Sequence, residues 1–279
     1  MAEVNISTEK KGKILSFHPL VEGDFNFWAF SAVEKSLLEA FSLARVVVFP
    51  QVFPEVLFRY AQRRGLFFFP DYRVRFDFPG KDGQFFLWQA LGLPSPETVF
   101  VPKLAAFGDH PNSTSLSLPS FPFVVKTTDE HEGQGVFLVE DEVSWKKALS
   151  YLKARERAGR FGFLLQEYLP SPYDLRVVVI GRELIPCWRK KEEGFKSNLA
   201  QGGEVIPCPD RRLEAEALAL ASRLVSETGV NLVAVDFLLK EGAPVLNELN
   251  FVFGRRTLKD FDKLFLKAFE AFLEELPPG

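Results

Sequence analysis

Several residue types are scarce in this chain of 279 residues, and each scarcity excludes a class of protein. The two cysteines, Cys187 and Cys208, are too few for a disulfide scaffold or a cysteine-based metal cluster. The three histidines form no His/Cys or Ser/His pair, which argues against a hydrolase that works through a covalent intermediate. The chain must therefore act without the commonest nucleophiles and soft metal ligands.

Long apolar runs and strong net charge are also missing. No run reaches the length of a membrane span, and the first twenty residues lack the apolar segment of a signal peptide. The net charge of −3 creates no basic field that would attract nucleic acid. We therefore expect a cytoplasmic protein with reduced thiols and with no membrane or nucleic-acid partner, which could act as a homodimer.

The first eighty residues alternate short apolar runs with amphipathic segments. Strands are expected within 13–20, 45–50 and 66–70, and helices within 31–44 and 54–65. This alternation is typical of βαβ units on a parallel sheet. The loop after the first strand reads "HPLVEGDFN" and lacks the GxGxxG of a dinucleotide-binding fold. The pattern predicts an α/β unit over residues 1–80 without a phosphate loop of its own.

The pattern changes after about residue 80. A helix is expected within 83–92, and a strand, a glycine loop, a strand and a helix follow over 121–157. Two hairpins are expected within 173–191 and 236–251, with a long helix between them and a last helix that begins at about residue 257. The whole chain is therefore predicted to be an α/β (α+β) protein with a second, larger unit over 81–279.

The second hairpin, "DFLLKEGAPVLNELNF", holds two acids and an amide inside apolar strands. If Glu241–Ala243 form the loop, Asp236 lies opposite Glu248, and Asn250 shares a face with Glu248. Directly opposed carboxylates destabilise a strand pair unless a cation lies between them. Oxygen ligands of this kind favour Mg²⁺. The alternative is a polar stripe that faces solvent.

A lysine and a glycine loop precede this hairpin in "FPFVVKTTDEHEGQGVF". Lys126 ends an apolar strand, and Gly133 and Gly135 follow in a loop whose backbone N–H groups could turn toward an anion. The loop is not a Walker A motif, because no G-K-[ST] and no helix follow it. The alternative is a flexible loop beside a solvated lysine.

The first hairpin gathers guanidinium groups. A two-residue turn at Gly181–Arg182 sets Asp174 opposite Arg189 and puts Arg176 on one face with Cys187. Arginine suits phosphate oxygens, and the alternative is a surface salt bridge of little energetic value. Together, the lysine, the arginines and the oxygen ligands could neutralise a nucleoside triphosphate and its Mg²⁺.

The order of these motifs resembles the ATP-grasp superfamily, and within it the RimK-type and glutathione-synthetase-like carboxylate–amine ligases. The resemblance runs from about Lys81 to the C-terminal helix and is strongest over "LLQEYLPSPYDLRVVVIG", "RKKEEGFKSNLAQGG" and "GVNLVAVDFLLKEGAPVLNELN". It implies a Rossmann-like pre-ATP-grasp domain over 1–80 and a two-lobed ATP-grasp domain over 81–279. The small lobe would span about 97–166 and the large lobe about 167–279.

The resemblance also implies roles for individual positions. Residues near the phosphates and the acyl substrate, which would be catalytic, are Arg176, Arg189 and Asn198. Residues that would bind ATP are Lys81, Lys126, Gly133, Gly135, Gln166, Glu167, Tyr168, Leu169 and Asp174. The ligands of Mg²⁺, or of Mn²⁺, would be Asp236, Glu248 and Asn250.

Two segments depart from the family pattern. The loop "DEHEGQGV" has fewer glycines than is usual, and "FVFGRR" follows Asn250 where related enzymes tend to read "ASPG". Arg255 and Arg256 could clamp a substrate carboxylate, or they could flank the last helix as solvated charges.

The function implied is an ATP- and Mg²⁺-dependent ligase that joins small-molecule or peptide carboxylates and amines through an acyl phosphate. Three alternatives remain open from the sequence: a small-molecule kinase, a protein that binds ATP without catalysis, and a structural α/β protein that binds no nucleotide.

Overall fold

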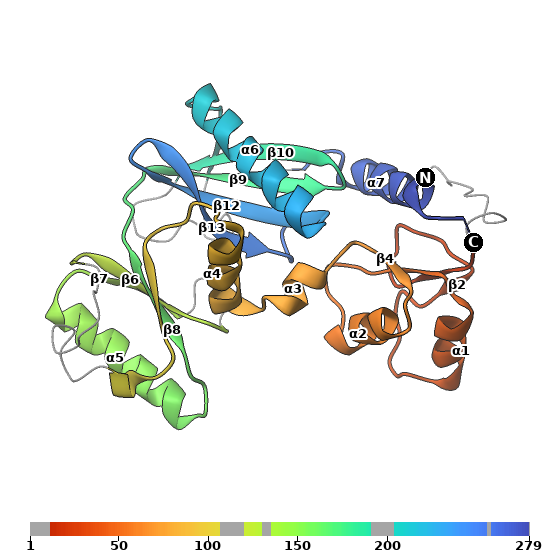
Figure 1. Cartoon of the computed structure of the whole chain (residues 1–279), viewed down its shortest axis with the longest axis horizontal. Coiled ribbons are helices and arrows are strands. Elements are labelled where there is room, and N and C mark those ends of the chain that lie inside the picture. The colour runs from red at the N-terminus through yellow and green to blue at the C-terminus, as the bar shows by residue number, and fades with distance from the viewer. Residues whose placement is uncertain (1–11, 107–119, 130–134, 191–203, 256–257, 279) are drawn as a thin grey trace.

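A computed structural model describes residues 12–106, 120–129, 135–190, 204–255 and 258–278, and within them the chain forms three sheets (Figure 1). The N-terminal sheet is parallel in the order β2-β1-β3-β4, which consist of Phe25–Asn26, Ile14–Ser16, Val46–Val48 and Phe67–Phe69. Helices α1 (Lys35–Leu43) and α2 (Glu55–Arg63) connect its strands, and α3 (Arg73–Asp77) follows. The predicted βαβ alternation is confirmed, and only elements too short for a periodic signal, β2 and α3, were not predicted.

The second sheet is antiparallel in the order β5-β8-β6-β7. Its strands are Thr98–Val101, Phe163–Glu167, Phe123–Thr127 and Val136–Val139, and the short 3₁₀ helix η1 spans Leu104–Ala106. Helix α5 (Glu142–Arg157) buries Trp145, Leu149 and Leu152 in a core that belongs to this lobe alone. Asp141 caps the helix in a reciprocal capping box with Ser144, which fixes where it begins.

The third sheet is antiparallel in the order β11-β10-β9-β12-β13. Its strands are Glu204–Ile206, Glu183–Lys190, Tyr173–Ile180, Leu232–Lys240 and Ala243–Asn250. Helix α6 (Arg211–Thr228) covers one face of this sheet and lies against β9, β10 and β13 (Figure 1). Helix α4 (Gly80–Leu91) contacts the outer strand β13. The opposite face of the sheet therefore stays available for polar side chains.

The last helix, α7 (Phe261–Glu275), links the third sheet to the N-terminal sheet. Its Phe265 and Phe269 rings lie 5.2 and 5.5 Å from the ring of Phe69 at the end of β4. On its other side, Ala268 lies so close to Gly181 that a Cβ there would come within 2.5 Å of the Ala268 methyl group. Gly181 also needs its positive φ of 61° for the β9–β10 turn, so glycine is required twice over.

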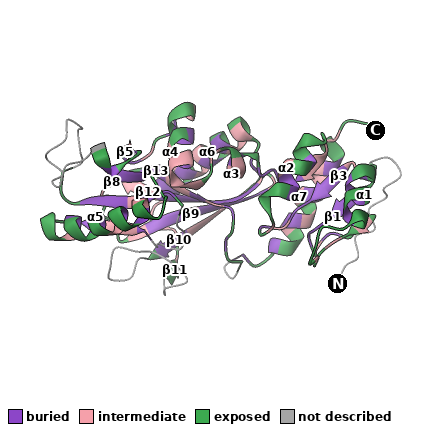
Figure 2. Cartoon of the chain, turned by 90° about the horizontal axis from the view of Figure 1, so that it is seen from below, coloured by how far each residue is buried: buried purple, intermediate pink, exposed green. Residues whose placement is uncertain are grey.

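One continuous core joins the N-terminal sheet, α7 and the third sheet. Figure 2 colours the buried segments of these elements in purple. The mixed α/β class is confirmed, whereas the division into domains at residue 80, where α4 begins, stays a prediction. Within the described ranges, no helix combines the length and apolar character that a membrane crossing needs.

His18 supplies a pH-dependent contribution to this core. It follows β1, stacks on Phe265 at 4.2 Å and accepts a hydrogen bond from the Leu20 N–H through Nδ1. Burial, and then the positive charge of Arg255, lowers its pKa from 6.5 to about 4. The unfolded chain therefore binds a proton between pH 6.5 and 4 that the folded chain refuses, and stability falls as the pH falls through this window.

The variant His18→Asn keeps an acceptor for the Leu20 N–H but does not titrate. Across the same window, the wild type is expected to lose about 2–3 kcal/mol more unfolding free energy than the variant, at about 1.4 kcal/mol per pKa unit. Urea unfolding at pH 7 and at pH 4 measures this difference. Parallel losses in the two proteins would contradict the lowered pKa of His18.

Candidate functional site

The two hairpins place their charged residues on one face of the third sheet, opposite α6. Asp236 pairs with Glu248 on β13 and with Arg176 on β9. Arg189 pairs with Asp174, and Cys187 pairs with Arg176. The sequence predicts the pairs within each hairpin, but it does not predict that Asp236 pairs with Arg176 across the two hairpins. Side-chain alternation puts all of these residues on the same face.

The predicted pairing of Asp236 with Glu248 in the second hairpin is confirmed, but the turn that leads to it differs from the predicted one. The turn consists of Glu241 and Gly242 alone, with φ of 51° and 75°, and Lys240 pairs with Ala243 rather than with Pro244. The predicted three-residue loop is therefore wrong. A bulge at Asn247, between Leu246 and Glu248, restores the count and brings Asp236 back opposite Glu248.

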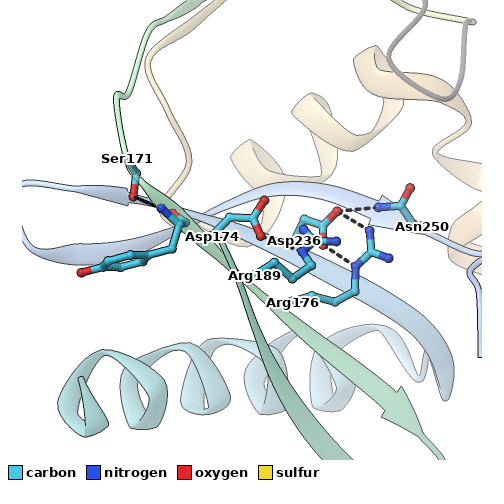
Figure 3. A network of polar contacts seen from close by, with 7 residues as sticks. Ser171, Asp174, Arg176, Arg189, Asp236 and Asn250 are labelled. Carbon is cyan, nitrogen blue, oxygen red and sulfur yellow. Dashed lines mark hydrogen bonds and ion pairs between the residues drawn. The ribbon is translucent and has the colours of Figure 1, made fainter. Parts of the chain in front are cut away.

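Asp236 lies at the centre of a hydrogen-bonded network (Figure 3). Arg176 donates from Nε and Nη2 to its two carboxylate oxygens, both at 2.7 Å. Arg189 donates from Nη2 to Asp236 at 3.1 Å and from Nε to Asp174 at 2.7 Å. Asn250 Nδ2 donates to Asp236 at 2.9 Å. The alternative of a surface salt bridge is excluded for Arg189, because its side chain is only 4% exposed.

The pairing keeps the buried Asp236 and Arg189 ionised. Burial by itself would raise the pKa of Asp236, but Arg189 and Arg176 outweigh it and hold that pKa below its usual value. Burial would likewise lower the pKa of Arg189, and Asp236 and Asp174 raise it instead. The network is therefore a set of mutually dependent charges, in which removal of one leaves another uncompensated.

Glu248 differs from its neighbours. It is half-buried, and within the described residues its carboxylate has no hydrogen bond or ion pair. No group of three or more His, Cys, Asp or Glu side chains in the described ranges could hold a metal. The predicted metal ligands Asp236, Glu248 and Asn250 do not form such a group, because one of the three is an amide. All three supply oxygen atoms from two adjacent strands, which fits a hard cation. Asp236 can join such an ion only when one of its present hydrogen bonds is exchanged.

A pocket lies beside this network, between the second and third sheets. It is lined by Lys81, Phe85, Trp88, Ser95, Thr98, Lys126, Leu164, Gln166, Asn247 and Glu248. Four of the predicted site residues therefore meet there although they come from four different elements. Lys81 lies in the first turn of α4, not ahead of the helix as predicted. Lys126 Nζ, on β6, donates to Asn247 Oδ1 at 2.8 Å across the two sheets.

The segment predicted to bind the adenine, Gln166 to Leu169, begins at the same pocket, which Gln166 lines. The Gln166 side chain is buried and donates to Thr98 Oγ1 at 3.1 Å. Glu167 accepts from Lys240 Nζ at 2.7 Å, and Lys240 also reaches Glu97 at 3.2 Å. Tyr168 and Leu169 continue from β8 as a half-buried connection to β9. Lys240 thus ties the third sheet to the edge of the second.

The other predicted residues lie apart from this pocket or cannot be placed. Gly135 precedes β7 and has a φ of 68°, and its carbonyl accepts from the Thr127 N–H at 2.9 Å. Arg255 lies after β13, where its guanidinium stacks on Phe261 at 4.2 Å. Gly133, Asn198 and Arg256 lie outside the described residues.

Three residues of the site were not predicted: Asn247, Lys240 and Gln84. Gln84, on α4, is buried and binds the backbone of Leu249, the residue between Glu248 and Asn250. Its Oε1 accepts from the Leu249 N–H at 2.8 Å, and its Nε2 donates to the Leu249 carbonyl at 3.0 Å. The side chain satisfies the outer edge of β13 as another strand would. The only signal in the sequence is a lone glutamine among apolar helix positions.

Gln84→Met is expected to lower the free energy of unfolding by about 1–3 kcal/mol, because it leaves both backbone groups of Leu249 without partners. Gln89→Met, at an exposed position of the same helix, is the matched control and should change stability by less than about 0.5 kcal/mol. Urea unfolding measures both. Equal values for the two variants would remove Gln84 from its assigned role.

Comparison with known proteins agrees with this arrangement. The model of the RimK-like ATP-grasp domain family matches residues 104–264, more than half of the chain. A protein of Xanthomonas oryzae named a probable alpha-L-glutamate ligase is 28% identical over 171 residues, which are 59% of this chain and 53% of that protein. Human beta-citrylglutamate synthase B is 28% identical over 57% of this chain and 40% of its own length. The chain thus spans about half the length of the curated relatives it matches.

Comparison with a solved structure supports the same fold. The crystal structure of a RimK-domain ATP-grasp protein from Sphaerobacter thermophilus has a TM-score of 0.56 at 18% identity and covers 81% of each chain. The α/β unit followed by two antiparallel lobes, with a pocket between the lobes, is therefore the ATP-grasp architecture that the motif order indicated. Because the family model matches more than half of the chain, the chain belongs to the RimK-like ATP-grasp domain family, and its pocket and fold agree with this.

Proposed function

We propose that this protein is an ATP- and Mg²⁺-dependent ligase that joins a carboxylate to an amine through an acyl phosphate. The observation that carries the proposal is the pocket between the lobes. It brings Lys81 and Lys126, two cations from different elements, together with Gln166 and Glu248. Two cations and a carboxylate that line the same pocket suit a triphosphate and its metal.

In this proposal, Lys81 and Lys126 bind the phosphate oxygens, and the segment from Gln166 to Leu169 binds the adenine edge through its backbone. Lys126 exchanges its bond to Asn247 for the nucleotide. A carboxylate oxygen of the acid attacks the γ-phosphorus, and ADP leaves. The amine nitrogen then attacks the acyl carbon, inorganic phosphate leaves and the nitrogen loses a proton. The protein contributes position and charge, and no side chain acts as a nucleophile.

Asp236, Glu248 and Asn250 would hold the Mg²⁺, which when bound neutralises charge that develops on the phosphates. Arg176 and Arg189 keep Asp236 ionised and fixed on the face of the sheet. In the structure, Arg189 and Asp174 bind each other and are almost fully buried. Their predicted contacts with substrate and ribose therefore need this pair to open, and Arg189 acts first as a positioning residue.

The first amine to test is glutamate, since both curated relatives carry glutamate in their names. Purified protein with ATP and Mg²⁺ is screened for ADP release with pairs of carboxylic acids and amines. A ligase releases ADP only when both substrates are present, whereas a small-molecule kinase needs a single acceptor. ATP with Mg²⁺ should also raise the melting temperature, because a ligand that binds only the folded state stabilises it. No thermal shift and no ADP release would contradict the proposal.

A further inference from the structure

Two polar side chains follow strands of the N-terminal sheet and contact the segment that comes after Asn250. Gln51 comes after β3 and Tyr72 after β4. The Phe253 N–H donates to Gln51 Oε1 at 3.3 Å, and the Phe251 ring lies 6.3 Å from the Tyr72 ring. The segment from Phe251 to Arg255 therefore runs from the predicted metal ligands across the carboxyl edge of this parallel sheet.

Both side chains keep an unused hydrogen-bond donor. Gln51 is 8% exposed and Tyr72 is fully buried, yet Gln51 Nε2 and the Tyr72 hydroxyl have no hydrogen-bond partner among the described residues. Neither residue has a further contact elsewhere in the described chain that would supply one. A buried polar group without a partner costs about 1–3 kcal/mol. Two such groups at neighbouring strand ends indicate that a ligand completes them.

The charge around these donors is positive. Arg75 Nη1 donates to the Gln51 carbonyl at 2.7 Å, and its guanidinium lies 5.5 Å from the centre of the Tyr72 ring. No ion pair in the described part of the chain includes Arg75. Arg255 is exposed at the same edge, where it stacks on Phe261 and lies 3.5 Å from Asp262. The nearby Asp71 is already bound by Arg73. The surroundings therefore favour an anion.

We propose that this carboxyl edge, formed by Gln51, Tyr72, Arg75 and Arg255, binds a carboxylate of the acid substrate that is not the one activated by ATP. In α/β proteins, ligands bind beyond the carboxyl ends of parallel strands. The donors here are an amide N–H, a hydroxyl and two guanidinium groups, which together match a carboxylate. The ligand approaches past the exposed Arg255 toward the buried donors. The acid substrate is then a dicarboxylate, an inference that rests on the proposed ligase function.

The proposed carboxylate site and the predicted metal ligand Asn250 are joined by one short segment of the chain. Phe251, which packs against Tyr72, is the residue directly after Asn250. A dicarboxylate held at the edge would thus lie next to the strand that ends at the predicted metal ligand, with its second carboxylate directed to the phosphates. The two carboxylates would have different roles, one for recognition and one for reaction.

The test uses glutarate as the probe and measures its binding to the full-length protein by calorimetry without nucleotide. Tyr72→Phe removes only the hydroxyl. It should weaken glutarate binding about tenfold or more, the value of one hydrogen bond to a charged group. Its melting temperature should equal or exceed that of the wild type, because a buried hydroxyl without a partner is gone. Gln51→Glu keeps the acceptor for the Phe253 N–H and replaces the donor by a negative oxygen, so binding should be lost.

One control defines the site. Tyr60→Phe removes a hydroxyl elsewhere on the N-terminal unit and should bind glutarate like the wild type. The proposal is overturned if glutarate does not bind the wild type at millimolar concentration, if Tyr72→Phe binds it unchanged, or if inorganic phosphate binds there instead of glutarate. Because no ATP is present, these outcomes are independent of whether ADP release is observed.

Discussion

Arg189→Met is expected to lower the free energy of unfolding by about 3–5 kcal/mol, the usual cost of a buried charge that has lost its partner. Arg189 donates to the Asp174 carboxylate at 2.7 Å and to Asp236 at 3.1 Å, so its removal takes a positive charge from two carboxylates at once. The side chains of Arg189 and Asp174 are 4% and 5% exposed, so solvent cannot replace the lost interaction. Methionine fills similar volume, and the loss is therefore electrostatic. Urea unfolding at pH 7, followed by circular dichroism, measures it.

The matched control is Arg182→Met at the turn of the same hairpin. Arg182 pairs with Glu275, but the two side chains are 83% and 57% exposed, and such a pair contributes about 0–1 kcal/mol at most. The cost of Arg189→Met should also shrink at low pH, because Arg189 holds the pKa of Asp236 below its usual value and a protonated carboxyl group needs no counter-charge. A loss below about 1 kcal/mol at pH 7 would mean that water reaches Asp174 and that the network is not closed.

Glu248→Gln is expected to lower the rate of ADP release about a hundredfold or more, since a bound metal ion contributes several kcal/mol to phosphoryl transfer. The amide keeps the shape of the side chain and one oxygen, but it removes the negative charge that the cation needs. Without metal, the variant should be as stable as the wild type or more stable, because Glu248 directly opposes Asp236 and like charges there repel. ADP release as a function of Mg²⁺ concentration measures the effect.

Glu241→Gln, at the exposed turn of the same hairpin, is the control and should leave ADP release unchanged. A defect in metal binding predicts that more Mg²⁺ partly restores the rate of Glu248→Gln. Full activity of this variant at low Mg²⁺ would remove Glu248 from the metal site, and a large drop in melting temperature would show a structural role instead.

The identity of the paired residues could be predicted because strand geometry is local. Alternation with period two and a glycine turn were enough to set Arg189 against Asp174 and Arg176 beside Cys187. The second hairpin shows the limit of such counting. A turn one residue shorter and a bulge at Asn247 cancelled each other, and neither has a clear sequence signal. The bulged Asn247 then became the partner of Lys126, which counting along the hairpin could not indicate.

By itself, the sequence determined the α/β class, the order of the elements and the face on which the charged residues lie, since each follows from neighbours within a few positions along the chain. Only the tertiary structure decided what those residues meet. Gln84 and Leu249 are 165 positions apart, and the same helix and strand bring Lys81 and Glu248 to one pocket. Helix α7 joins two sheets that come from distant parts of the chain. Such contacts depend on how separate surfaces pack. For the same reason the unpaired donors of Gln51 and Tyr72 became visible only in the folded protein.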